Sequence, residues 1–318
     1  SPNAVPPAGG GARRLPALGP AAGAVAALVG LVALNALFTP GFATAGNLWN
    51  VLLQVAEVLL VAVGMTLVIA TGGVDLSVGS VMALAGAVAA VSLGRGAAVG
   101  LGLAAALGVG LVNGLLVARA RVQPIVVTLA TLIAGRGLAQ VVSNDGQLVT
   151  VSDAGFLALG RGHLGPVPVQ VLVALLAAAA AAFALRATAF GRYVLAAGGN
   201  APAARLAGVP VARTLVSVYA LSALLAGLAG VVTAARLGAS DAAKIGLNAE
   251  LDAIAAAVVG GTALAGGRAT VFGTVVGALV MQVIAVSFNM LLLPYALSLV
   301  LKAAIILGAV YLQRPRRV

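Results

Sequence analysis

Ten apolar runs dominate this chain and restrict what it can fold into. A membrane-spanning helix needs roughly 17 to 25 mainly apolar residues, and most of the runs are that long. Only 8% of the residues are charged, whereas a soluble domain carries about 25%. The sequence therefore predicts an all-α, polytopic membrane protein with about ten transmembrane helices. The runs are 21–38, 49–71, 80–93, 97–118, 123–143, 168–185, 214–235, 250–263, 270–290 and 295–312.

Two of the runs, 80–93 and 250–263, are short for a complete crossing. Each adjoins a glycine-rich stretch, and paired glycines interrupt a membrane helix. We therefore expect these runs to be parts of broken or re-entrant helices.

Basic residues mark the ends of alternate helices, which the positive-inside rule assigns to the cytoplasm. Both termini are expected on that side, and the net charge of +11 then reflects membrane orientation instead of a nucleic-acid partner. The basic residues on this side are Arg13, Arg14, Arg119, Arg121, Arg186, Arg192, Arg205, Arg213, Arg314, Arg316 and Arg317.

The chain reads as one membrane domain with short tails. Residues 1–20, rich in proline and glycine, are expected to form a disordered cytoplasmic tail. Residues 21–313 form a single transmembrane domain, and residues 314–318 form a basic cytoplasmic tail. The first apolar run is long for a signal peptide, so cleavage is not expected.

Several kinds of chemistry are excluded by composition. The chain has no cysteine and one histidine, which excludes disulfides, thiolate metal sites and multi-histidine metal sites. No G-x-x-x-x-G-K-[ST] motif is present, so the chain cannot cradle ATP phosphates in a P-loop. We expect no metal, no cofactor and no enzyme activity; any ATP hydrolysis must come from another subunit.

The stretch from Ala70 to Ser80 carries the first candidate site. Gly72 and Gly73 break the helix, and Asp75 with Ser77 can cap the next one. Transporters place such breaks at the substrate site, where free backbone groups bind a polar solute. A plain cytoplasmic turn explains the same residues, so both interpretations stay open. The stretch 260–268, containing Gly260, Gly261 and Thr262, presents the same choice between a broken helix and a close-packed turn.

Ionisable residues inside apolar runs are costly unless they face protein or water. Glu57, Arg136 and Lys302 are of this kind. We favour a buried ion pair that joins helices, between Glu57 and either Arg136 or Lys302. A proton or sodium relay would use the same residues, which keeps an ion-coupled secondary transporter using Glu57 and Asp75 as an alternative.

A short helix is predicted within the cytoplasmic stretch 191–209. Asn200 or Ala201 can begin it with Pro202 in its first turn, and Gly208 can end it. Such a capped helix between two spans suits docking of a soluble partner, whereas a passive loop is the alternative. The candidate contact residues are Gly198, Gly199, Asn200, Ala203, Ala204, Arg205 and Gly208.

The polar residues in and near the apolar runs are mainly hydroxyls and amides. Such groups make weak, replaceable hydrogen bonds to a neutral solute, whereas a phosphate or carboxylate would need converging arginines. The candidate translocation pathway comprises Gln54, Glu57, Thr66, Gly72, Gly73, Asp75, Ser77, Asn113, Gly260, Gly261 and Thr262.

At these residues the sequence resembles the permease subunits of bacterial ATP-binding-cassette (ABC) importers for monosaccharides, the ribose, xylose and galactose group. The resemblance covers about residues 45–313. Stretches 134–140, 146–150 and 250–254 are most similar to the galactofuranose permease within that group. The motifs that carry the resemblance are 63–69, 73–80, 197–208, 250–255, 260–262 and 266–268.

The resemblance implies a permease of the bacterial inner membrane that imports a neutral monosaccharide. It implies three kinds of partner: ATPase subunits, a second permease subunit that is the same chain or a homologue, and a periplasmic sugar-binding protein. It also implies that 197–208 is the coupling helix, which docks into a cleft of the ATPase. The proline- and glycine-rich N-terminus departs from the family pattern.

Overall fold

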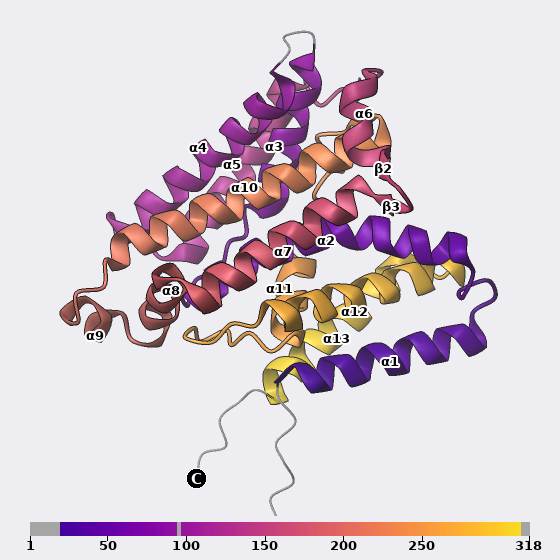
Figure 1. The fold of residues 1–318 in the computed structure, drawn as a ribbon. Coiled ribbons are helices and arrows are strands. Elements are labelled where there is room, and N and C mark those ends of the chain that lie inside the picture. The colour runs from indigo at the N-terminus through magenta and orange to yellow at the C-terminus, as the bar shows by residue number, and fades with distance from the viewer. Residues whose placement is uncertain (1–19, 94–96, 313–318) are drawn as a thin grey trace, which may run out of the picture.

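The computed structural model describes residues 20–93 and 97–312, which form a largely helical protein (Figure 1). The predicted tails 1–20 and 314–318 lie almost wholly outside these residues. The helices are α1 (Pro20–Phe38), α2 (Ala45–Ala70), α3 (Val78–Val91), α4 (Ala98–Ala118), α5 (Pro124–Val142), α6 (Ala154–Arg161), α7 (Val169–Ala187), α8 (Ala189–Gly199), α9 (Ala201–Leu206), α10 (Val211–Leu237), α11 (Ala249–Val259), α12 (Val271–Met290) and α13 (Tyr295–Leu312).

Two short antiparallel strand pairs supplement the helices. Strand β1 (Val149–Thr150) pairs with β4 (Ala239–Ser240), and β2 (His163–Leu164) pairs with β3 (Val167–Pro168). The first pair ties the segment after α5 to the segment after α10, two parts of the chain that are distant in sequence.

All ten predicted apolar helices are present, α9 corresponds to the short helix predicted to begin at Asn200 or Ala201, and α6 and α8 are additional. Within the described residues, six helices are long and apolar enough to cross a membrane: α2, α4, α5, α7, α10 and α12. Helices α1, α3 and α13 contribute shorter apolar stretches. The polytopic helical class is confirmed, while ten complete crossings and the side of each terminus stay predictions.

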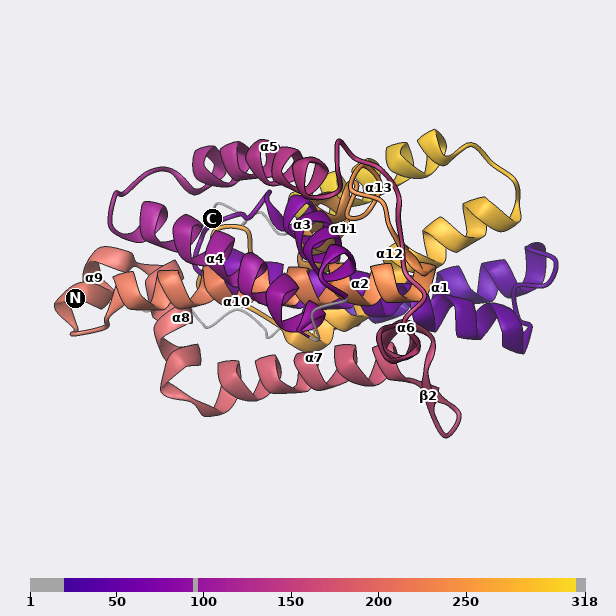
Figure 2. The ribbon, with the colours of Figure 1, turned by 90° about the horizontal axis from the view of Figure 1, so that it is seen from above.

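Helices α2 and α10 form the centre of the molecule. Helix α10 packs against α2, α3 and α4, and α2 also packs against α7, α11 and α12. Seen from above, α5 and α7 occupy opposite edges with α2 and α10 between them (Figure 2). This placement explains why α2 and α10 are mostly buried within the protein while α4 and α5 expose most of their surface.

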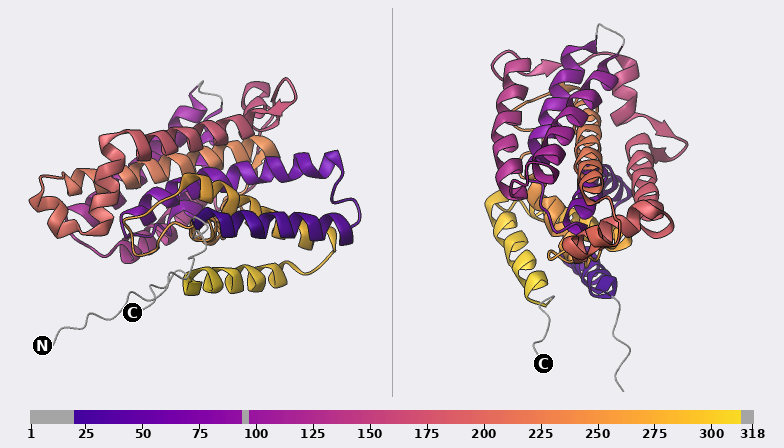
Figure 3. Two further views of the ribbon diagram at one scale, coloured as in Figure 1. Left: turned by 60° about the horizontal axis from the view of Figure 1, so that its bottom comes forward. Right: turned by 90° about the vertical axis from the view of Figure 1, so that its left-hand side faces the viewer.

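The two ends of the molecule differ. Helices α8 and α9 lie at one end, and α6 with the β2–β3 hairpin lies at the other (Figure 1), a separation that is also visible in the left view of Figure 3. Helix α7 runs between the two ends and leads into α8.

Local chemistry sets several helix boundaries. The Thr44 side chain accepts a hydrogen bond from the Asn47 amide and begins α2. Gly72, at φ +80°, follows the end of α2, and Gly238, at φ +71°, ends α10. These left-handed backbone conformations favour glycine, because other residues would place a Cβ against the backbone.

Candidate functional site

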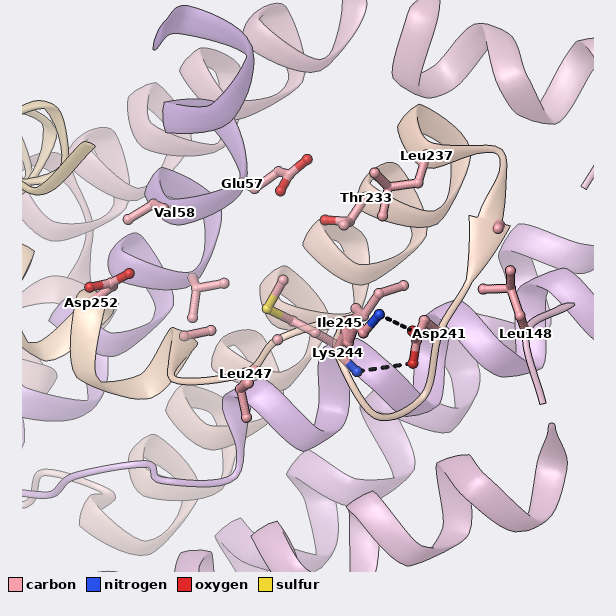
Figure 4. Close-up of a pocket in the computed structure, with 15 residues that line it drawn as sticks. Glu57, Val58, Leu148, Thr233, Leu237, Asp241, Lys244, Ile245, Leu247 and Asp252 are labelled. Atoms are coloured by element: carbon pink, nitrogen blue, oxygen red, sulfur yellow. Dashed lines mark hydrogen bonds and ion pairs between the residues drawn. The ribbon is translucent and has the colours of Figure 1, made fainter. Parts of the chain in front are cut away.

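A cavity of about 400 Å³ lies between α2, α3, α10, α11 and the loop that joins α10 to α11 (Figure 4). Its wall is mainly apolar, with a few polar groups, as is typical of sites for small molecules. We call this space the wall-paired cavity. Its lining residues are Glu57, Val58, Val61, Met82, Leu148, Thr233, Leu237, Ala239, Asp241, Lys244, Ile245, Gly246, Leu247, Ala249 and Asp252.

Each of the three carboxylates in this wall has a basic partner. One pair joins α2 to α10, one joins α11 to α13, and one lies within the loop after α10. The wall therefore presents paired charges, which suit a neutral solute better than an ion. The pairs are Glu57–Arg236 at 2.6 Å, Asp252–Lys302 at 2.7 Å and Asp241–Lys244 at 3.6 Å.

The predicted buried ion pair of Glu57 is confirmed, but both predicted partners are wrong. Glu57 accepts a hydrogen bond from Nε of Arg236 in the last turn of α10, and Lys302 pairs with Asp252 instead. Arg236 lies one residue beyond the predicted apolar run 214–235. Because α10 extends to Leu237, Arg236 belongs to its last turn, and the Arg236 guanidinium reaches Glu57 on α2.

Arg136 holds the loop that forms one side of the wall-paired cavity. Its Nη1 donates hydrogen bonds to the backbone carbonyls of Ala242 at 2.8 Å and Ile245 at 2.7 Å. Gly246, at φ +70°, then meets the backbone of Gly79 in the first turn of α3. A guanidinium with two carbonyl acceptors and a glycine-to-glycine contact fix this loop against α5 and α3.

Asp75 is the centre of a buried polar cluster in the break between α2 and α3. Its Oδ1 accepts hydrogen bonds from the Ser77 amide at 3.0 Å and the Ser77 hydroxyl at 2.6 Å. Its Oδ2 accepts from the Ser222 hydroxyl of α10 at 3.1 Å. The predicted cap is wrong in detail: Ser77 is the N-cap residue of α3, but its side chain makes no capping hydrogen bond. Its hydroxyl instead donates to Asp75 and accepts from the Asn113 side chain.

The cluster continues through α4 into α5. Nδ2 of the Asn113 side chain donates to the Ser77 hydroxyl at 3.0 Å, and the Thr131 hydroxyl donates to Oδ1 of the Asn113 side chain at 2.6 Å. Thr128 also donates to the carbonyl of Val74 at 3.3 Å. The break is therefore a packed junction between α4, α5 and α10 and not an exposed turn. Sequence reasoning missed the roles of Ser222, Thr128 and Thr131 in this cluster.

Two further predicted pathway residues join α2 to α12. Gln54 accepts a hydrogen bond from Gln282 at 2.8 Å, and the hydroxyls of Thr66 and Thr274 lie 2.7 Å apart in a fully buried contact. Neither residue lines the wall-paired cavity.

The second glycine-rich stretch forms the turn between α11 and α12. Gly260 packs on the backbone of Gly273, and Gly261 adopts φ +93°. The Thr262 hydroxyl accepts a hydrogen bond from the Thr270 amide at 3.4 Å. This arrangement is a close-packed turn. Of the predicted pathway residues, Glu57 alone is among those that line the wall-paired cavity.

The predicted short helix after Gly199 is confirmed as α9. The Asn200 side chain accepts a hydrogen bond from the Ala203 amide at 3.0 Å, and Gly208 follows the helix at φ +81°. Arg205 is exposed and the Leu206 side chain is 92% exposed, whereas Ala204 is buried against the protein. Ala204 therefore supports the helix from inside, and Leu206 is a surface residue that the prediction missed.

Metal chemistry has no support in the described part of the chain. Across residues 20–93 and 97–312, no three acidic, histidine or cysteine side chains gather to hold a metal ion.

Comparison with known proteins shows the family to which the sequence belongs. A family profile described as "Branched-chain amino acid transport system / permease component" matches residues 47–310. The ribose import permease protein of Escherichia coli K12 is 41% identical over 300 residues, covering 92% of each chain. No solved structure matches the chain significantly.

Two further relatives also carry sugar names. The galactofuranose transporter permease protein of Escherichia coli K12 is 39% identical over 275 residues, covering 85% of this chain and 80% of its own. The L-arabinose ABC transporter permease protein of Azospirillum brasilense is 38% identical over 303 residues, covering 93% and 88%. The chain therefore belongs to this permease family, as a multi-pass inner-membrane subunit of an ABC importer that is not itself an enzyme.

Proposed function

We propose that this permease carries a neutral monosaccharide from the periplasm to the cytoplasm, and that the wall-paired cavity receives the sugar. The observation that carries the proposal is the pairing of all three wall carboxylates with basic groups, at 2.6 to 3.6 Å. A paired carboxylate still accepts hydrogen bonds from sugar hydroxyls but offers no net charge to an amino acid or a phosphate. The relatives are named for ribose, galactofuranose and arabinose, and galactofuranose is one candidate among these sugars.

Uptake into proteoliposomes is expected to be competed by neutral monosaccharides. The assay uses the assembled transporter with its binding protein and a radiolabelled sugar. Unlabelled ribose, arabinose and galactofuranose test the sugar class, while branched-chain amino acids and sugar phosphates are the controls. Competition by leucine or ribose 5-phosphate in place of neutral sugars would contradict the assignment.

ATP hydrolysis belongs to separate ATPase subunits, and a periplasmic binding protein delivers the sugar, as the ABC importer class implies. We infer that the end of the molecule that carries α8 and α9 faces the cytoplasm, with both termini and the tails 1–20 and 314–318 on the same side. Support comes from the arginines near this end, including Arg119, Arg186 and Arg213. The relatives lend no support to an ion-coupled mechanism through Glu57 and Asp75.

We also propose that a second permease, the same chain or a homologue, covers part of the exposed surface of α5. The Arg136 guanidinium on α5 donates to the carbonyls of Ala242 and Ile245, yet the residue is only partly buried. A partly exposed charge is costly against lipid, and a protein partner would cover it without that cost. Asp75, Ser77 and Asn113 lie behind α5 in the packed junction, and we propose that they join the pathway when the helix break opens.

Helix α9 is proposed as the ATPase docking element, with Asn200, Ala203, Arg205 and Gly208 at the contact. The exposed Leu206 adds an apolar anchor, since a leucine that is 92% exposed on a short capped helix has no contact of its own to bury it.

Arg205→Glu is expected to weaken ATPase binding at least about tenfold, or about 1.4 kcal/mol, because it reverses a charge at the contact. Membrane insertion should be unchanged, since Arg205 is exposed. Co-purification of the ATPase and sugar uptake measure the effect. Arg119→Glu, an equal charge reversal at the end of α4, is the control and should retain the ATPase. Normal ATPase binding by Arg205→Glu would remove α9 as the docking element.

A further inference from the structure

Three glycine-containing segments that are far apart in sequence meet at the base of α9. They are the end of α2 with Gly72, the end of α8 with Gly198, and the turn before α12 with Gly266 and Gly267. The Gly267 amide donates a hydrogen bond to the Ala70 carbonyl at 2.9 Å, which ties two of the segments together. We call this contact the glycine joint.

The segments of the glycine joint touch through backbone atoms. A Cβ at Gly198 would overlap the carbonyl oxygen of Ala70 and lie 2.7 Å from the Gly267 nitrogen. A Cβ at Gly266 would lie 2.8 Å from both the Gly198 carbonyl oxygen and the Gly72 nitrogen. No flexible side chain separates the three segments at these points, so a displacement of one must move the others.

The glycine joint lies between the proposed docking helix α9 and the segments that lead to the wall-paired cavity. Asn200, the N-cap of α9, is two residues after Gly198. Ala70 ends α2, five residues before Asp75, and the break leads into α3. The first turn of α3 then contacts the cavity loop through Gly79 and Gly246. The glycine joint, residues 70–79 of the chain and the Gly79–Gly246 contact therefore link α9 to the wall-paired cavity.

We propose that Gly198 and Gly266 are positioning residues for transport: they pass movement of the docked α9 to the helix break at Asp75 and so couple ATP hydrolysis to opening of the pathway. This inference rests on the proposed docking function of α9. Backbones in direct contact cannot yield by a change of rotamer, so a displacement of α8 and α9 at the joint shifts the end of α2 and the turn before α12 as well.

The test measures sugar uptake per ATP hydrolysed, using the complete transporter purified in proteoliposomes. Gly198→Ala is expected to lower this ratio about tenfold while the ATPase stays bound. Gly100→Ala, at a helical glycine with open space around its Cβ position, is the unchanged control.

A second variant addresses the case in which Gly198→Ala does not assemble. Two glycines inserted between Gly199 and Asn200 place no side chain in the joint and lengthen the connection between the joint and α9. ATPase binding should persist and uptake per ATP should fall as for Gly198→Ala. A wild-type ratio in Gly198→Ala or in the insertion variant would overturn the glycine joint. Failure of the docking proposal is a separate result, seen as unchanged ATPase binding by Arg205→Glu.

Discussion

Replacing Glu57 by alanine is expected to destabilise the permease by about 3 kcal/mol. The substitution removes the partner of Arg236 and leaves a guanidinium in the interior with no carboxylate. The Glu57 side chain is 14% exposed and that of Arg236 is 29% exposed, so partial solvation of Arg236 keeps the loss near the lower end for buried pairs. Thermal unfolding of the purified protein measures the change.

Two comparisons separate charge pairing from packing. The double variant Glu57→Gln with Arg236→Gln should recover much of the stability, because two amides can hydrogen bond with no unpaired charge. Lys244→Ala breaks a surface pair whose lysine side chain is 84% exposed, so it should cost under about 1 kcal/mol. An equally small effect of Glu57→Ala would show that its ion pair contributes nothing to the fold.

The positions of the apolar helices could be predicted because a helix that crosses lipid needs a long apolar run. Run 97–118 matches α4 at Ala98–Ala118, and run 295–312 matches α13 at Tyr295–Leu312. In each case the apolar run and the helix coincide, since every backbone group must be bonded within the helix at membrane depth. The capping signals around Asn200 predicted α9 for a different reason. The capping hydrogen bond joins residues that are close in sequence, Asn200 and Ala203, so the sequence alone can indicate it.

Pairings across the chain could not be predicted in this way. Glu57 and Arg236 are 179 residues apart, and the sequence contains other basic residues inside apolar runs, Arg136 and Lys302. Which one reaches Glu57 depends on how α2 lies against α10, a property of three-dimensional packing. The wall-paired cavity was missed for a related reason: much of its lining comes from the loop 239–249, which has no apolar periodicity to signal its position.

Asp75→Ala is expected to have the largest effect at the buried cluster, with loss of most folded permease and of sugar uptake. Asp75 is 1% exposed and accepts three hydrogen bonds, two from Ser77 and one from Ser222. Alanine leaves all three donors without this acceptor, and each buried unsatisfied group costs about 1–3 kcal/mol. The combined loss is of the order of the whole stability of a typical domain.

Asp75→Asn is expected to retain most stability and uptake. Its side-chain oxygen can accept both bonds from Ser77, and its amide can donate to the Ser222 hydroxyl, which accepts as readily as it donates. Among the described residues no basic side chain forms an ion pair with Asp75, so an amide leaves no cation behind. Asp153→Ala, which removes only the N-cap of α6, is the control and should cost about 1 kcal/mol. Folded yield, thermal unfolding and uptake per folded transporter compare the three variants; equal losses in the asparagine and alanine variants would show that Asp75 acts through its charge instead of its hydrogen bonds.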